Sequence, residues 1–343
     1  MENFKRLLKS NEYDFLRDNK YLGNNIILLT VGGSHAYGTN NESSDWDARG
    51  IALNAREDIL GFYSEPKFEQ VVDVDTDTTI YSLNKMVRLL CDNNPNTIEI
   101  LGCKPEHYLH VSKEGQMLLD NKDAFLSKRA IHSFVSYARA QLGRLENAVA
   151  RDSLPQKEKE KHILNSCLNA MGSFNERYKD FGNGGFNLSI GDSDKADIVS
   201  EIFCDVNLSH YPLRDFNGFV NELTSIVRSY NKVNHRNHKK DDAHLNKHIM
   251  HLFRLYIMGY DIIANKQIVT YREKEHDFLM SIRNGLFLNE DGTIKPNMYE
   301  ELHKLENKLE YAIKHTELPD RPDYKTIEEM VYEINKNTIL NRS

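Results

Sequence analysis

Two glycines and a serine, followed by two closely spaced aspartates, form the segment with the clearest chemistry. Gly32, Gly33 and Ser34 follow an apolar run, and Asp45 and Asp47 come after a short polar loop. Glycines permit a sharp turn that leaves backbone N–H groups open, and such groups at the start of a helix, with a hydroxyl, suit a phosphate. Carboxylates two residues apart on a strand share one face. Their repulsion favours a divalent cation between them, such as Mg²⁺ or Mn²⁺.

A third carboxylate is expected from a neighbouring strand. Asp73, Asp75 and Asp77 alternate along a predicted strand over residues 68–80, so the pattern alone leaves all three open. Three carboxylates beside a phosphate cradle would hold two metal ions for in-line phosphoryl transfer. The alternative is an ordinary turn followed by an exposed strand edge. Each element alone is a weak signal, but the order of strand, turn, helix and strand favours the functional interpretation.

The surrounding pattern predicts the elements that must position these residues. Residues 26–31 are continuously apolar and end at the glycines, which predicts a buried strand. We expect a helical turn over 34–37 and a second strand over 46–53. A helix over 2–18 precedes them, and helices over 82–91 and from Pro95 follow the third strand. The first 110 or so residues therefore mix strands and helices.

The rest of the chain carries helical apolar spacing. Helices are predicted over residues 124–150, 157–178, 216–233, 243–264, 274–286, 298–314 and 324–337. The glycine-rich run 181–185 reads as a flexible connection. We therefore expect an α+β protein with an N-terminal domain over 1–115, built from a mixed sheet with helices, and an all-α C-terminal domain over 116–343.

Composition and charge exclude several classes of protein. The chain has 343 residues and a net charge of −7, which is ordinary for a folded protein and argues against a generally basic nucleic-acid binder. Residues 41–77 hold ten acidic against three basic side chains, whereas residues 228–254 hold seven basic against two acidic. The four cysteines lack CxxC spacing, and no apolar stretch near the N-terminus spans a bilayer. We expect a cytoplasmic protein with reduced thiols and no membrane partner.

At Gly33-Ser34 and Asp45-Trp46-Asp47 the sequence resembles the nucleotidyltransferase superfamily related to DNA polymerase beta. The longer form, Gly-Ser-x-x-x-Gly-Thr followed by Ser-Asp-x-Asp-x-Arg-Gly, is similar to the RlaP-type branch of bacteria and phages, proposed to act in RNA repair. The resemblance implies a polymerase beta-like catalytic domain, a metal chemistry and a nucleotide donor.

Further matches extend the resemblance along most of the chain. They lie at residues 81–85, 94–99, 247–255, 282–285 and 318–323. Counted back from Lys85, the family's third carboxylate falls on Asp77, which the resemblance therefore favours over Asp75. Residues of about 181–242 correspond least, and we interpret them as an insertion.

The resemblance assigns roles to the acidic residues. Asp45, Asp47 and Asp77 would be both metal ligands and catalytic residues for two Mg²⁺ or Mn²⁺ ions, and Gly33 and Ser34 would bind the phosphates of an NTP.

Five basic side chains are also candidate ligands for phosphate. Lys247, His251 and Arg254 share one face of a predicted helix, Arg283 would join from the next helix, and Arg49 shares a strand face with Asp47. We predict nucleotide or phosphate binding for all five. The alternative for Lys247 and Arg254 is pairing with carboxylates.

These residues predict a nucleotidyltransferase that moves an NMP from an NTP to an acceptor hydroxyl and releases pyrophosphate. The expected acceptor is an RNA end, such as a tRNA or a repaired RNA. The alternatives are nucleotidylation of a small molecule or a protein, which the acidic composition suits, and a non-catalytic nucleotide or RNA binder, which has no need of three carboxylates.

Overall fold

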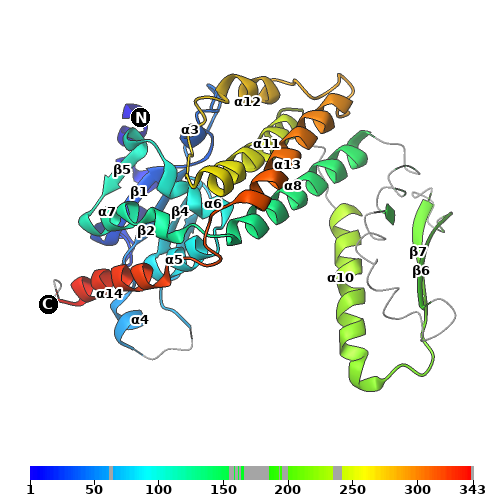
Figure 1. Ribbon diagram of the computed structural model, residues 1–343, viewed down its shortest axis with the longest axis horizontal. Coiled ribbons are helices and arrows are strands. Elements are labelled where there is room, and N and C mark those ends of the chain that lie inside the picture. Colours follow the sequence, from blue (N-terminus) through cyan, green and yellow to red (C-terminus); the bar gives the residue numbers. More distant parts are fainter. Residues whose placement is uncertain are drawn as a thin grey trace. The chain divides into compact units, whose positions relative to one another are not determined.

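The computed structural model describes most of the chain and divides it into two compact units (Figure 1). The described residues are 1–61, 65–153, 158, 161, 164–165, 185–192, 194, 200–234 and 242–340. Unit 1 comprises Met1–Ala140, Met250–Arg283 and Tyr299–Ser343, and unit 2 comprises Gln141–Ile249 and Asn284–Met298. Unit 1 thus joins the N-terminal part to two later segments, and the domain boundary at residue 115 stays a prediction.

A mixed five-stranded sheet forms the centre of unit 1. Its strands are β1 (Ile26–Val31), β2 (Ala48–Ala52), β3 (Gln70–Asp73), β4 (Thr78–Ser82) and β5 (Tyr108–Val111), in the order β3-β4-β2-β1-β5. β2 and β4 run parallel, whereas β1 pairs antiparallel with β2 and β5, and β3 pairs antiparallel with β4. β1 is buried along its whole length, as its sequence, apolar except for Thr30, predicts.

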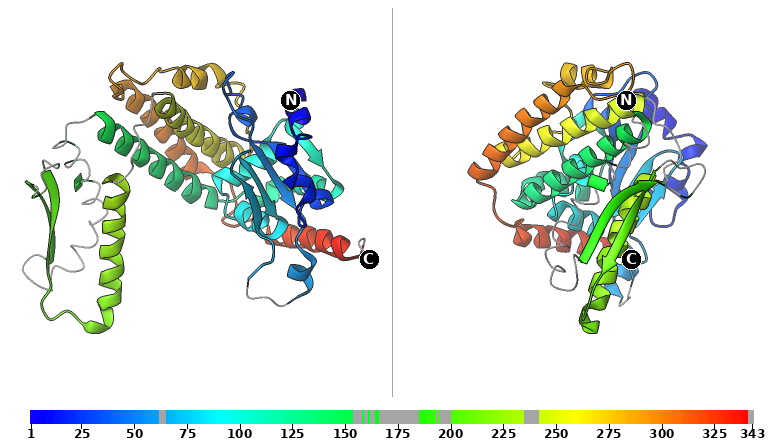
Figure 2. Two further views of the ribbon diagram at one scale, coloured as in Figure 1. Left: turned by 180° about the vertical axis from the view of Figure 1, so that it is seen from behind. Right: turned by 90° about the vertical axis from the view of Figure 1, so that its right-hand side faces the viewer.

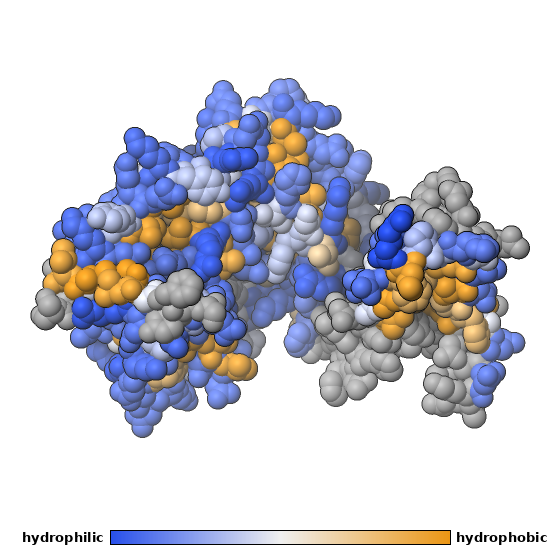
Figure 3. Space-filling model, turned by 90° about the horizontal axis from the view of Figure 1, so that it is seen from below, coloured by the Kyte–Doolittle hydropathy of each residue, from blue (hydrophilic) through white to orange (hydrophobic). Residues whose placement is uncertain are grey.

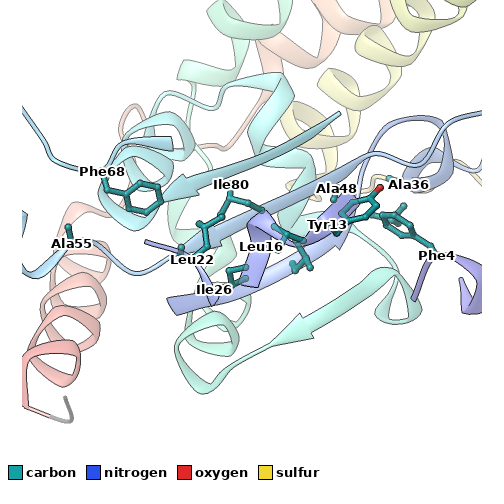
Figure 4. Close-up of a cluster of buried hydrophobic side chains, with 13 residues drawn as sticks. Phe4, Tyr13, Leu16, Leu22, Ile26, Ala36, Ala48, Ala55, Phe68 and Ile80 are labelled. Atoms are coloured by element: carbon teal, nitrogen blue, oxygen red, sulfur yellow. The ribbon is translucent and has the colours of Figure 1, made fainter. Parts of the chain in front are cut away.

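The N-terminal helices cover one face of this sheet. They are α1 (Glu2–Leu7), a 3-10 turn (Asn11–Tyr13) and α2 (Phe15–Asp18), and Figure 2 (left) shows them in dark blue across the strands. Phe4, Tyr13 and Leu16 pack with Val31 and Ile80 of the sheet in one buried apolar cluster (Figure 4). Burial of this cluster anchors the elements that carry the aspartates.

Short helices connect the strands of unit 1, and further helices follow its last strand. They are α3 (Gly33–Tyr37), α4 (Arg56–Leu60), α5 (Leu83–Cys91), α6 (Pro95–Ile98), α7 (Lys113–Asp120), α12 (His276–Arg283) and α14 (Tyr324–Leu340). Ser82 caps α5 by accepting from the backbone N–H of Lys85, and Asn94 caps α6, whose first residue is Pro95. Both starts follow from the capping residues and the proline in the sequence.

Three long helices have residues in both units: α8 (Arg129–Ser153), α11 (Asp242–Asn265) and α13 (Pro296–His315). Unit 2 also contains α10 (Phe216–Asn234) and the antiparallel pair β6 (Gly185–Asp192) and β7 (Ser200–Asn207). Apolar side chains gather on its face in Figure 3, and those exposed include Phe203, Val206 and Phe216.

The fold class is confirmed: a mixed sheet with helices is followed by a largely helical region. The β6–β7 pair, at residues 185–207, is an addition to the predicted all-α region and lies within the segment interpreted as an insertion. The helix predicted over 157–178 lies, apart from four residues, outside the described part of the chain. In that described part, no helix is long and apolar enough to cross a membrane.

Three predicted elements differ in the structure. The helix over 2–18 is broken into three short pieces. The strand expected over 46–53 begins only at Ala48, so Asp45 and Asp47 precede it. The strand expected over 68–80 is a hairpin, because Asp73 Oδ1 accepts from the backbone N–H of Thr76 at 2.9 Å and closes a turn. Asp73, Asp75 and Asp77 therefore do not share one strand face.

Candidate active site

Asp47 lies directly against the glycine turn at the start of α3. Gly33 has φ +56°, in the left-handed region that favours glycine, and a Cβ built on it would be 1.4 Å from Asp47 Oδ2. The backbone N–H of Gly32 donates to the carbonyl of Asp47 at 2.8 Å, which continues the β1–β2 pairing by one residue. The glycine turn and the Asp47 carboxylate are therefore in contact, and any side chain at position 33 would displace that carboxylate.

The parallel pairing of β2 and β4 brings a second carboxylate alongside. Ala48 pairs with Thr78 at the start of the two strands, and Asp47 and Asp77 are the residues immediately before them. Asp77 has φ +43°, a conformation that aspartate tolerates better than most residues. Of the three candidates left open by the sequence, Asp77 is the one beside the start of β2; Asp73 ends β3, and its carboxylate accepts from Thr76 within the turn.

Arg49 binds Asp77 in this structure. Its Nη2 lies 3.1 Å from Asp77 Oδ1, and its Nη1 donates to the Asp77 carbonyl. The Arg49 side chain is 21% exposed and that of Asp77 is 64% exposed. An ion pair this open to water contributes about 0–1 kcal/mol, so the guanidinium can be exchanged for another cation at small cost.

Asp45 is exposed and belongs to a loop tied by its own hydrogen bonds. Ser44 Oγ donates to Asn41 Oδ1 at 2.8 Å and accepts from the Asn41 N–H at 2.9 Å. Between the two aspartates, the Trp46 indole stacks on the His35 ring of α3. Burial lowers the pKa of His35, so the neutral imidazole is favoured at this position.

Arg283, at the end of α12, holds the same loop. Its Nη1 donates to the Thr39 carbonyl, and its Nη2 lies 3.0 Å from Ser44 Oγ. Its predicted role was phosphate binding, but the structure places this guanidinium on the loop that leads to Asp45. Two of its nitrogens are engaged there.

Arg254 lies in the interior of unit 1, with 3% of its surface exposed. Its Nη1 is 3.3 Å from Glu99 Oε2, its Nη2 is 2.7 Å from His251 Nδ1, and its guanidinium lies 3.4 Å from the centre of the Tyr37 ring. The Tyr37 hydroxyl also donates to Glu99. This network fixes the C-terminal end of α3.

The predicted basic face on α11 is therefore divided in the structure. Arg254 pairs with a carboxylate, which is the alternative that the sequence left open, and His251 contacts Arg254. Lys247 is exposed and belongs to unit 2. Neither Tyr37 nor Glu99 was predicted to be a site residue, although Glu99 falls within the matching segment 94–99. Nothing in the sequence near Tyr37 or Glu99 indicates that each contacts Arg254, which lies 155 or more positions away along the chain.

The three aspartates fit a magnesium or manganese ion in residue type and backbone position. Carboxylate oxygens are the ligands that both ions prefer, and Asp47 and Asp77 immediately precede the neighbouring parallel strands β2 and β4. Among the described residues, no three His, Cys, Asp or Glu side chains are yet close enough to hold a metal. In this structure Asp45 is exposed to solvent, and Asp77 pairs with Arg49.

Comparison with known proteins bears on the same segment. The family described as the RNA repair pathway DNA polymerase beta family, RlaP, matches residues 2–163. The match covers 162 of the 343 residues, just under half of the chain. The match contains Gly33, Ser34 and all three aspartates, whereas Lys247, His251, Arg254 and Arg283 lie outside it. No curated protein and no solved structure gives a significant match.

The match supports a polymerase beta-like nucleotidyltransferase of an RNA repair pathway. The donor nucleotide, the acceptor and the metal are not given by the match.

Proposed function

We propose that the chain transfers an NMP from an NTP to the hydroxyl of an RNA end, with Mg²⁺ or Mn²⁺ as cofactor. The acceptor oxygen forms a bond to the α-phosphorus, the bond from that phosphorus to the α–β bridging oxygen breaks, and pyrophosphate leaves. The hydroxyl proton passes to solvent.

One observation carries the proposal. Asp47 rests on the glycine turn of α3 and immediately precedes β2, as Asp77 immediately precedes the parallel strand β4. A phosphate at the α3 turn would therefore lie next to two carboxylates, an arrangement that is unfavourable for an anion unless divalent cations neutralise it. The geometry consequently supports a metal–triphosphate complex better than phosphate alone.

Different residues of the site would bind the triphosphate and the metal ions. Gly33 and Ser34 would hold the β- and γ-phosphates through N–H and hydroxyl donors. Asp45 and Asp47 would hold both ions, and Asp77 only the ion nearest the acceptor. Bound ions would supply charge neutralisation and favour deprotonation of the acceptor hydroxyl. Positioning by the protein then accounts for most of the rate.

Arg49 would change partner as the substrate binds. Once Asp77 turns to a cation, the guanidinium is released beside the phosphate turn, where a Cβ on Gly32 would be 2.9 Å from Arg49 Cγ. Lys247 and His251 remain predicted phosphate ligands. For Arg254 and Arg283 we propose a structural role instead, because their guanidinium groups hold α3 and the aspartate loop.

A small molecule or a protein is the alternative acceptor. Asp75 is exposed on the β3–β4 turn next to Asp77, and a carboxylate there favours a cationic acceptor over a polyanion. The salt dependence of acceptor binding distinguishes an RNA end from a small acceptor. The logarithm of the affinity for an RNA end should fall with the logarithm of the salt concentration, with a slope of about −0.7 per phosphate contacted. A small acceptor should show little dependence.

Incubation with each NTP, labelled at the α-phosphate, and with separate pools of RNA, protein and metabolites tests the proposal. Label is expected in the RNA pool with Mg²⁺ or Mn²⁺ present, and it should disappear with Asp47→Asn. Label in another pool would identify the alternative acceptor. Retained transfer by Asp47→Asn would overturn the assignment of the site.

A further inference from the structure

Three aromatic rings form a continuous stack through the candidate site. The Trp46 indole lies between the His35 ring, at 3.6 Å between centroids and 11° between planes, and the Phe4 ring, at 4.7 Å and 9°. The Phe4–Trp46 spacing is that of an offset stack, which is favourable beyond the area it buries. The stack joins α1, α3 and the aspartate loop: Phe4 precedes His35 by 31 residues and Trp46 by 42.

The two ends of the stack are fixed in different ways. Phe4 is fully buried and belongs to the apolar cluster under the sheet, where it meets Tyr13 edge to face. Figure 4 shows it beside Ala36 of α3. His35 follows Ser34 directly, and its Nε2 is 3.3 Å from the Ser44 carbonyl of the aspartate loop.

The side chain of Trp46 has different surroundings from those of its neighbours Asp45 and Asp47. The indole packs against the apolar cluster, whereas the Asp47 carboxylate lies on the Gly33 backbone and Asp45 is exposed. The partly buried indole between the two aspartates therefore constrains the backbone from which both carboxylates project.

We propose that Trp46 is a positioning residue, which sets Asp45 and Asp47 against the phosphate turn through its stack on His35 and Phe4. This inference rests on the proposed function, because it assigns the aspartates a metal and a triphosphate to hold. It extends that function by making an uncharged side chain of the loop responsible for the geometry of the charged ones.

Substitution of Trp46 by leucine and by phenylalanine tests the inference. Trp46→Leu removes the stack, whereas Trp46→Phe keeps a ring between His35 and Phe4. Phe68→Leu is a matched control: Phe68 stacks on Tyr21 at 5.1 Å and 7° in the same apolar cluster, at the opposite end in Figure 4. It removes a buried stack without touching the aspartate loop.

Two readouts separate positioning from general stability. Mn²⁺ affinity is measured by calorimetry with a non-hydrolysable NTP analogue, and the rate is measured with α-labelled NTP. Because a misplacement of about 1 Å costs about 100-fold in rate, Trp46→Leu should lose at least about tenfold in both affinity and rate. Trp46→Phe and Phe68→Leu should stay within about threefold, although Phe68→Leu lowers the unfolding temperature as Trp46→Leu does.

The stack itself has a readout that needs no activity. Ring currents should shift the His35 ring protons upfield in the proton NMR spectrum, and Trp46→Leu should abolish that shift. Wild-type affinity and rate in Trp46→Leu, or equal losses in Trp46→Leu and Phe68→Leu, would overturn the positioning role alone. A wild-type protein that shows the His35 shift but neither binds Mn²⁺ nor transfers label would overturn the proposed function, and the inference with it.

Discussion

Substitution of Gly33 by alanine should remove activity while costing little stability beyond backbone strain. At φ +56° the new methyl group would begin 1.4 Å from Asp47 Oδ2, and real Cβ contacts are essentially never under 3.0 Å, so the carboxylate must move by about 1.6 Å. Rotation of the side chain accommodates this movement. The strain of an L-residue in the left-handed region costs about 1–2 kcal/mol, and a displacement of about 1 Å costs about 100-fold in rate.

Gly23→Ala supplies the matched control. Gly23 has φ +62°, nearly the same as Gly33, but its Cβ would meet only the Arg17 carbonyl, at 3.1 Å. Both variants should therefore lose a similar free energy of unfolding in urea titrations. Only Gly33→Ala should lose transfer from α-labelled NTP, by about 100-fold. Equal activity in the two variants would refute the contact between Asp47 and the glycine turn as the basis of the site.

Three further predictions concern groups around the site. Arg254→Met leaves Glu99 buried without its cationic partner, so we expect a loss of about 3–5 kcal/mol in urea unfolding; a loss under about 1 kcal/mol would show that the pair is not buried. Burial raises the pKa of Cys103 to about 12, so mass spectrometry should find it unalkylated by iodoacetamide at pH 8 while exposed Cys204 reacts; alkylated Cys103 in the folded protein would contradict this. Burial lowers the pKa of His35 from 6.5, so the unfolded chain takes up the proton first, and the His35 contribution to the unfolding free energy should fall as pH drops below about 6.5. The emission of Trp46, the only tryptophan, should titrate with a midpoint below that value, and a midpoint above it would contradict the burial.

Local signals in the sequence predicted much of the catalytic fold. The apolar run of β1, the glycines after it, and the caps at Ser82 and Asn94 each act within a few residues of themselves. Such elements form where predicted because their causes are local.

The predictions were wrong where a turn, or pairing with a distant part of the chain, determines the structure. Alternating valines and aspartates gave the period of a strand over residues 71–77, and the Asp73–Thr76 turn interrupts it. The position of Asp77 beside Asp47 depends on parallel pairing across 30 residues, which alternation along one strand does not encode.

The basic residues show the same limit more sharply. Helical spacing correctly places His251 and Arg254 side by side, but it does not reveal that Glu99 and Tyr37 occupy the guanidinium. Arg283 resembles a phosphate ligand by charge alone, whereas its contacts are a carbonyl and a hydroxyl of the aspartate loop. A sequence identifies a charge, and the packing around it determines what that charge binds.

The most direct test of the account compares the position of the label in the NTP. The protein is incubated with Mg²⁺, RNA and one NTP labelled at either the α- or the γ-phosphate, beside Asp47→Asn and Asp77→Asn variants whose circular dichroism matches wild type. Nucleotidyl transfer predicts α-label on the RNA, γ-label in pyrophosphate, and neither product with the variants. γ-Label on the RNA, or unchanged α-label transfer by either variant, would contradict the account.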